Sequence, residues 1–165
     1  MPGLPATDDV FFDSLRGEDP LGAVVRAHIH IEARLSQVLE ALTLHPSHLP
    51  NLRYEQRIKL AVALGLAERI LLPLKILGDI RNAFGHRLDV TLTHDMVDKL
   101  LESFEEDDRD VIRSAFANTQ SELGLEGMPR IDEADPRVKF IMIAVALDKF
   151  LIVAEKEARV NRKAA

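Results

Sequence analysis

The sequence contains no cysteine, no tryptophan and a single tyrosine among its 165 residues. The lack of cysteine excludes a disulfide scaffold, a thiolate metal site and a cysteine nucleophile. A chain of this length can bury about 70% of its unfolded surface, so neither a disulfide nor a metal is needed to stabilise it. We therefore expect no cofactor and no metal site, and we expect His and Arg to supply any chemistry.

Basic charge is also scarce, because 21 Lys and Arg stand against 27 Asp and Glu, a formal charge of −6. Proteins that grip duplex DNA by its phosphates carry a basic face, so the composition disfavours direct binding of duplex DNA. The longest purely apolar run, Phe140–Leu147, is far shorter than the ~18 residues that a membrane span needs. Residues 1–9 lack the basic and apolar regions of a signal peptide. Together these absences predict no membrane partner and a cytoplasmic location.

Apolar residues recur at three- and four-residue steps through most of the chain, the spacing of one helical face. The sequence predicts an all-α fold, a single-domain helical bundle of about six to seven helices. Residues 1–7 are expected to be a flexible tail, 8–160 the domain and 161–165 a C-terminal tail. The expected helices span approximately 8–15, 20–44, 58–64, 72–84, 94–104, 107–123 and 136–160.

Several helix ends carry a recognisable signal. Asp19-Pro20 and Asp135-Pro136 predict helix starts, because Asp caps unpaired N–H groups and Pro fits the first turn. Gly65 predicts a left-handed helix end, with Leu66 packing back onto the helix. Gly85 is expected to end the helix that begins near residue 72. The last helix is apolar all round in its first half, so it should be central and buried.

The segment of greatest chemical interest begins at Arg81. On a helix, Arg81 falls within the apolar face that contains Ile80 and Phe84. An Arg pointing into a bundle needs an anion, either a protein carboxylate or a ligand such as phosphate, because an unpaired buried charge costs several kcal/mol. Glu32 is the carboxylate positioned to serve, four residues after His28 at the edge of an apolar stripe. We therefore predict that Glu32 lies near Arg81.

His86 stands five residues after Arg81. An unbroken helix would place the two side chains roughly 140° apart, whereas a break at Gly85 would let His86 swing back toward Arg81. An Arg beside a His could cleave RNA, because the His can move a proton near neutral pH and the Arg can hold charge on phosphorus. The predicted binding residues are Arg81, Asn82, His86, Glu32 and His28; Arg81 and His86 are the catalytic pair in the case of a nuclease.

The segment Arg81–His86 resembles the Arg-(Asn/Asp/His)-x3-His motif of the HEPN-like helical superfamily. Taken with Arg57–Leu66, it resembles more narrowly the mannitol-operon repressor (MltR-like) family, over roughly residues 8–104. Gly85 stands where that family usually has Ala. The resemblance implies a helical, homodimeric regulator of transcription with no recognised DNA-binding motif.

Three functions stay open at this point. The first is a regulatory protein that binds a protein partner, or alternatively RNA, at a groove around Arg81 and His86. The second is a metal-independent endoribonuclease, which requires both side chains exposed in one groove, with two motif copies facing each other across a dimer cleft. The third is an inert scaffold, which requires Arg81 sealed against Glu32.

Overall fold

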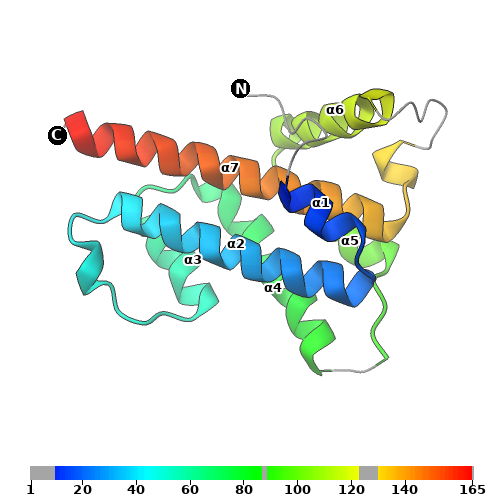
Figure 1. Ribbon diagram of the computed structural model, residues 1–165, viewed down its shortest axis with the longest axis horizontal. Coiled ribbons are helices and arrows are strands. Elements are labelled where there is room, and N and C mark those ends of the chain that lie inside the picture. Colours follow the sequence, from blue (N-terminus) through cyan, green and yellow to red (C-terminus); the bar gives the residue numbers. More distant parts are fainter. Residues whose placement is uncertain (1–9, 87–88, 123–129, 165) are drawn as a thin grey trace.

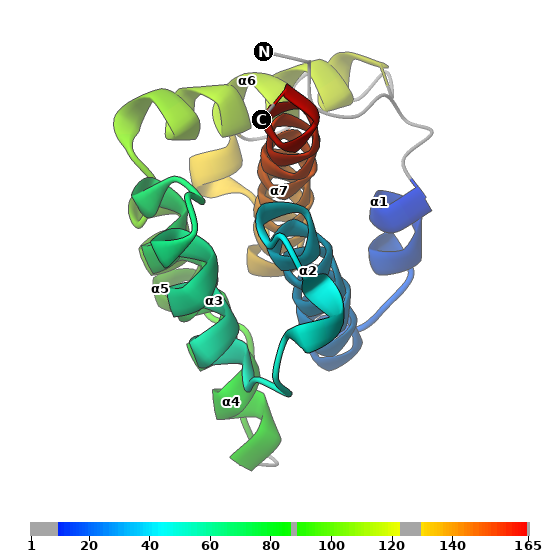
Figure 2. The ribbon, with the colours of Figure 1, turned by 90° about the vertical axis from the view of Figure 1, so that its left-hand side faces the viewer.

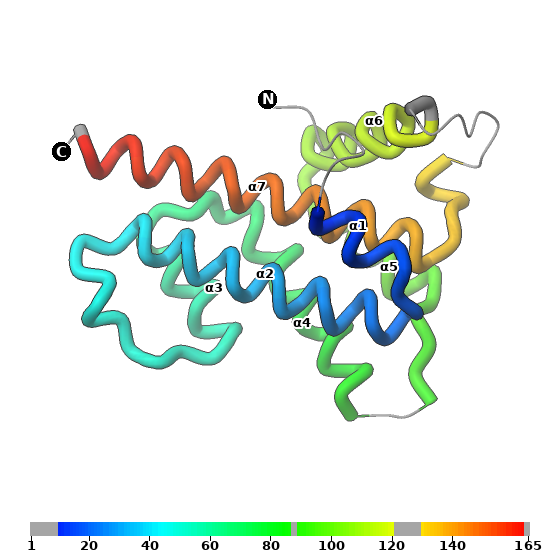
Figure 3. Tube along the Cα trace, in the orientation of Figure 1, coloured from blue at the N-terminus to red at the C-terminus, as the bar shows by residue number. Residues whose placement is uncertain are grey.

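Two long helices form the centre of the molecule in a computed structural model that describes residues 10–86, 89–122 and 130–164. Helix α2 (Pro20–Leu42) and helix α7 (Pro136–Ala164) lie side by side and run in the same direction (Figures 1 and 3). Polar contacts join the N-terminal part of α2 to that of α7 and the C-terminal part of α2 to that of α7. These contacts are Arg137 to Glu18 just before α2, His30 to Asp148, and Arg162 to Glu40.

The remaining helices cover the α2–α7 pair from two sides. In Figure 2, α1 lies on one side of the pair, while α3, α4 and α5 lie on the other and α6 crosses over α7. The described residues form seven α-helices and no strand, so the predicted all-α bundle is confirmed. The further helices are α1 (Val10–Arg16), α3 (Tyr54–Ala63), α4 (Leu71–His86), α5 (His94–Glu102) and α6 (Glu106–Glu122), with 3-10 turns at Pro46–His48, Glu68–Ile70 and Ile131–Glu133.

Helix α7 is buried over its first half, as its composition predicts. Every residue of Phe140–Leu147 is buried, and so are the charged residues on either side, Lys139 and Asp148. The expected end at about residue 160 is too early, because α7 continues to Ala164. Arg162 Nη1 donates to backbone carbonyls of the C-terminal end of α2, at 3.3 and 3.2 Å. Residues 161–164 therefore belong to a helix docked on α2.

The helix start at Asp19 and the helix end at Gly65 are found where the sequence places them. The Asp19 carboxylate accepts a hydrogen bond of 2.7 Å from the backbone N–H of Gly22, so it caps α2. Gly65 has a φ of 120°, and the Leu66 N–H donates to the Ala61 carbonyl at 2.9 Å. This 6→1 hydrogen bond after a positive φ is the helix-ending turn that the sequence predicts.

Gly85 does not end α4, which continues through His86. Among the described residues Gly65 alone has a positive φ, so Gly85 does not adopt the left-handed conformation that stops a helix. A Cβ added to Gly85 would meet nothing within 4 Å, so no close approach requires glycine there. Helix α4 therefore carries Arg81 and His86 in one continuous helical frame. None of the described helices combines the length and apolarity that crossing a membrane requires.

Candidate functional site

Arg81 is exposed on α4, contrary to the prediction that it points into the bundle. Around the helix axis Arg81 lies between Leu77 and Leu74, which are both buried, so the helical face alone does not account for its exposure. The C-terminal part of α4, which carries Arg81, extends beyond α2 to the edge of the bundle (Figure 1). A long Arg side chain at such an edge can extend its charged head into water. Its Nη1 donates to Oδ1 of Asn82 at 3.1 Å, and Asn82 is exposed too. Because Arg81 is exposed, it needs neither a protein carboxylate nor a ligand anion to offset its charge.

Glu32 forms its ion pair with Arg57 on α3, at 3.3 Å between carboxylate oxygen and Nη1. In the part of the chain that the structure describes, no ion pair joins Glu32 to Arg81, so Arg57 and not Arg81 is the ion-pair partner of Glu32. That Glu32 lies near Arg81 stays a prediction. His28 lies 3.9 Å from Glu32 through Nδ1, and its ring packs against the ring of Tyr54 with centroids 4.4 Å apart. Glu32 is thus held by α2 and α3, while Arg81 points outward.

Arg81 nevertheless lies in the same electrostatic neighbourhood as His28 and Glu32. Burial lowers the pKa of His28, the positive charge of Arg81 lowers it further, and Glu32 opposes both effects. Burial also raises the pKa of Tyr54, and the carboxylates of Glu32 and Asp79 raise it further. The region beside α4 therefore mixes charges of both signs.

Tyr54 is a residue that sequence reasoning missed. Its hydroxyl donates to the Leu74 carbonyl at 2.9 Å and links α3 to α4. A Cβ on Gly78 would lie 2.9 Å from Cε1 of Tyr54, so the ring packs directly on the backbone of α4. The sequence did carry a signal, because Tyr54 is the only tyrosine of the chain and Gly78 lies within a helical stripe.

His86 is exposed at the last residue of α4. Since the helix is unbroken from Arg81 to His86, five residues at about 100° each separate the two side chains by roughly 140°. Within one chain they therefore do not face each other. Because Gly85 does not break the helix, the condition under which His86 would swing back toward Arg81 is not met.

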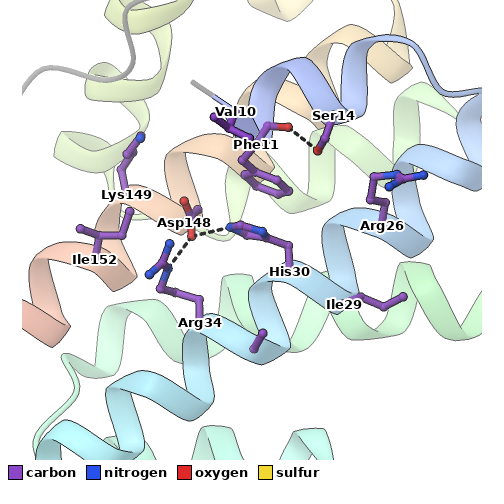
Figure 4. Close-up of a pocket in the computed structure, with 11 residues that line it drawn as sticks. Val10, Phe11, Ser14, Arg26, Ile29, His30, Arg34, Asp148, Lys149 and Ile152 are labelled. Atoms are coloured by element: carbon purple, nitrogen blue, oxygen red, sulfur yellow. Dashed lines mark hydrogen bonds and ion pairs between the residues drawn. The ribbon is translucent and has the colours of Figure 1, made fainter. Parts of the chain in front are cut away.

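A second polar site, which the sequence did not reveal, lies between α1, α2 and α7. It is a cavity of about 670 Å³, shown in Figure 4. At its centre the Asp148 carboxylate accepts hydrogen bonds from Nε2 of His30, at 3.1 Å, and from Nε of Arg34, at 2.9 Å. The lining residues are Val10, Phe11, Ser14, Arg26, Ile29, His30, Ala33, Arg34, Asp148, Lys149 and Ile152.

The Asp148 cluster is rigidly held. The Asp148 side chain is 3% exposed, whereas His30 and Arg34 are 35% and 24% exposed, so the anion is buried and its partners reach the cavity. The ring of Phe11 stacks on that of His30 with centroids 3.7 Å apart and planes 9° apart. Because an ionised carboxylate only accepts hydrogen bonds, Nε2 of His30 carries a proton toward Asp148.

The pKa of Asp148 reflects two opposing influences. Burial alone raises it, but the hydrogen bonds and positive charges of His30 and Arg34 together hold it below its ordinary value. Asp148 is therefore ionised at neutral pH and fixes the positions of both partners. Such an arrangement can orient a ligand in the cavity, and it offers N–H donors rather than a carboxylate to that ligand.

Two sequence signals could have pointed to this site. Asp148 is an acid inside a helix that is otherwise apolar from residue 140 to 154, apart from Lys149. His30 and Arg34 are four residues apart, so they share one side of α2, and that side faces away from the apolar stripe. What the sequence does not show is that these three residues meet, since 118 positions separate His30 from Asp148.

Among the described residues no group of three or more His, Asp and Glu side chains gathers as a metal site. Comparisons of the chain with protein-family models, with curated proteins and with solved structures found no match.

Proposed function

We propose that this chain is a cytoplasmic regulatory protein that binds another protein through the exposed side of α4 around Arg81, Asn82 and His86. The observation that carries the proposal is the exposure of all three side chains, with Arg81 hydrogen bonded to its neighbour Asn82 and to no carboxylate among the described residues. An inert scaffold would instead use Arg81 as a buried structural cation. An exposed Arg is also among the residue types that dominate the binding energy of protein interfaces.

The charges around Arg81 favour a protein partner over RNA. Carboxylates of Glu32 and Asp79 lie close enough to act on Tyr54, and they accompany the cations Arg57 and Arg81. A surface that binds a nucleic acid backbone presents mainly positive charge. The overall composition of this chain is acidic, with a net charge of −6. RNA is therefore the second partner that we test, and direct binding of duplex DNA ranks below it.

An endoribonuclease ranks below the regulator because Arg81 and His86 diverge by roughly 140° on one unbroken helix. A metal-free cleavage site needs the proton-moving His and the charge-stabilising Arg at the same phosphate. Only two copies of the chain, facing each other across a homodimer, could supply that arrangement. We propose a homodimer because the sequence resembles the mannitol-operon repressor family. The proposed role in transcription rests on the same resemblance.

The test of the regulator is partner capture by the purified chain, with Arg81→Ala and His86→Ala beside the wild type and partners quantified by mass spectrometry. Arg16→Ala is the matched control, because Arg16 is an exposed helical Arg on α1, on the other side of the α2–α7 pair (Figure 2). We expect one partner to be lost from the α4 variants and retained by the control. Identical partner sets for all four proteins, each folded by circular dichroism, would rule the α4 surface out.

A second assay addresses the enzyme. RNAs of varied sequence are incubated in chelator with wild type and with His86→Ala, and the oligomeric state is measured by light scattering. The regulator predicts no cleavage by either protein. Cleavage by the wild type that His86→Ala abolishes would show a nuclease instead, and a monomer would remove the composite site.

A further inference from the structure

We infer that the cavity between α1, α2 and α7 binds a small organic anion with an apolar body, a phosphate or carboxylate on an aromatic or aliphatic group. The proposal concerns a different part of the molecule from α4, so it holds or fails independently of the function proposed above. The cavity has a volume of about 670 Å³, which falls within the usual range of small-molecule sites.

The charge of the cavity lining favours an anion. Three permanent cations line the cavity, Arg26, Arg34 and Lys149, against one carboxylate, Asp148. The Asp148 carboxylate is buried and already accepts hydrogen bonds from His30 and Arg34. A cleft lined by cations beside low-dielectric walls concentrates anions.

Two further carboxylates belong to the same network but do not line the cavity. Glu18 pairs with Arg26 at 2.7 Å, and Glu155 lies 3.7 Å from Nη1 of Arg34. These acids hold the guanidinium groups in place from outside the lining. Arg34 uses Nε for Asp148 and Nη1 for Glu155 and for Gln37, whose Oε1 accepts at 2.7 Å, and Arg26 uses Nη2 for Glu18. A guanidinium has five N–H groups, so each Arg has further donors for an anion, and its fixed position lowers the entropy lost when the anion binds.

The same cavity has apolar walls that water solvates poorly. Val10 and Ile29 are 83% and 62% exposed, and Ile152 and Ala33 complete the apolar part of the lining. In Figure 4 Val10 and Ile152 lie on two sides of the polar centre made by Asp148 and His30. An apolar body placed there would cover hydrocarbon surface while its anionic group meets the cations. A bare inorganic anion would leave those walls uncovered.

The cavity can be blocked without touching the Asp148 cluster. Ala33 is an exposed helical residue of the lining, so Ala33→Phe fills the cavity with a ring. Lys149→Gln removes one lining cation and keeps the length of the side chain. The matched controls are Ala63→Phe and Lys59→Gln, both at exposed positions of α3 outside the lining.

The experiment is isothermal titration of the full chain with phenyl phosphate, phenylacetate, inorganic phosphate and benzyl alcohol. We expect 1:1 binding of phenyl phosphate, phenylacetate or both, with a dissociation constant on the order of 1 mM or tighter, and at least about tenfold weaker binding of inorganic phosphate and of the neutral alcohol. Binding of one acid but not the other assigns the anionic group. For the acid that binds more tightly, Ala33→Phe should raise the dissociation constant at least about tenfold and Lys149→Gln about three- to tenfold. Both control variants should keep the wild-type affinity.

Three results would overturn the proposal: no saturable binding of either acid, inorganic phosphate binding as tightly as phenyl phosphate, or unchanged affinity in Ala33→Phe. Arg81→Ala separates this site from the α4 surface, because we expect its affinity for both acids to equal that of the wild type. A loss of affinity in folded Arg81→Ala would place the anion on α4 and would likewise overturn the proposal.

Discussion

Helix α2 carries two histidines, two positions apart, that lead to different sites. His28 is buried on the α3–α4 side, 3.9 Å from Glu32 one helical turn away. His30 is half-exposed on the α1–α7 side, hydrogen bonded at 3.1 Å to Asp148, which lies 118 residues away. In the first pair the His is buried and the acid reaches solvent. In the second pair the acid is buried and the His reaches a cavity.

In these two pairs, the role of the pair depends on whether the His or the carboxylate is buried. A buried His beside an exposed acid and a Tyr ring is a packing element, since its ring contacts are satisfied inside the bundle. A buried acid instead fixes exposed donors, and fixed donors at a cavity are what a ligand site needs. We therefore assign the local pair to the stability of the α2–α3–α4 junction and the remote pair to the proposed anion site.

The largest expected effect is on stability at Asp148. Asp148→Ala should lower the free energy of unfolding by about 2–4 kcal/mol, because it removes the buried anion that holds Arg34 and His30 and leaves Arg34 with the more distant Glu155, at 3.7 Å. Glu32→Ala should cost less than about 1 kcal/mol, since Glu32 is 32% exposed and Arg57 keeps a hydrogen bond to the Leu52 carbonyl. Urea unfolding at pH 7 measures both. Equal decreases in the free energy of unfolding for the two variants would contradict the proposed difference between the two pairs.

Acid provides an independent check on Asp148. Because its pKa is lower in the folded chain than the ordinary value of 3.8, the carboxylate stabilises the folded state above about pH 4, and this stability is lost as the pH falls below 3.8. Asp148→Asn lacks that titration. Between pH 5 and pH 3 the wild type should therefore lose more stability than the variant.

A second, smaller effect concerns the packing of Tyr54 on α4. Gly78→Ala should destabilise the chain by about 1–2 kcal/mol, because its Cβ would lie 2.9 Å from the Tyr54 ring. Gly85→Ala on the same helix should stabilise it by up to about 1 kcal/mol, because nothing lies within 4 Å and Ala favours helix. Thermal unfolding of the two variants gives the sign of each change. Stabilisation by both would mean that the Tyr54 ring moves aside without cost.

The smallest expected effect is a change in the titration of His28. Arg81→Gln should raise the pKa of His28, because a cation that disfavours its protonation is removed, and Glu32→Gln should lower it further. NMR titration of the His28 ring measures both shifts. Since burial lowers the pKa of His28, the wild type should lose stability as the pH falls below 6.5, and His28→Gln should lose less. Shifts of the same sign in both variants would place Arg81 away from His28.

Much of the fold was predictable from the sequence because its helix ends depend on short-range chemistry. Asp19 caps α2, Thr93 caps α5 with a hydrogen bond of 3.3 Å from the Met96 N–H, and Gly65 ends α3. Gly85 gave the same signal as Gly65 and is helical, because a glycine permits a positive φ without requiring it. The C-terminal end of α7 was placed too early because the anchor of Arg162 lies on another helix.

The candidate site was less predictable. The sequence placed Glu32, His28 and Arg81 in one neighbourhood, and the charges felt by His28 agree with that placement. It did not show that Glu32 pairs with Arg57, because helical periodicity assigns a side chain to a face but not to one partner among several helices. Arg81 is exposed although it lies between the buried Leu74 and Leu77 around the axis of α4, because helical periodicity does not show how far along a helix its neighbours cover one face.

The sequence by itself determined the all-α fold, most helix starts, the central position of the apolar helix and the lack of thiol chemistry. These follow from periodicity, capping and composition, which act within a few residues. Only the tertiary structure decided that α2 and α7 run parallel in a register that brings His30 and Arg34 to Asp148. It also decided which side of α4 faces water. Both depend on how whole helices pack, and packing is set by surfaces that lie far apart in the chain.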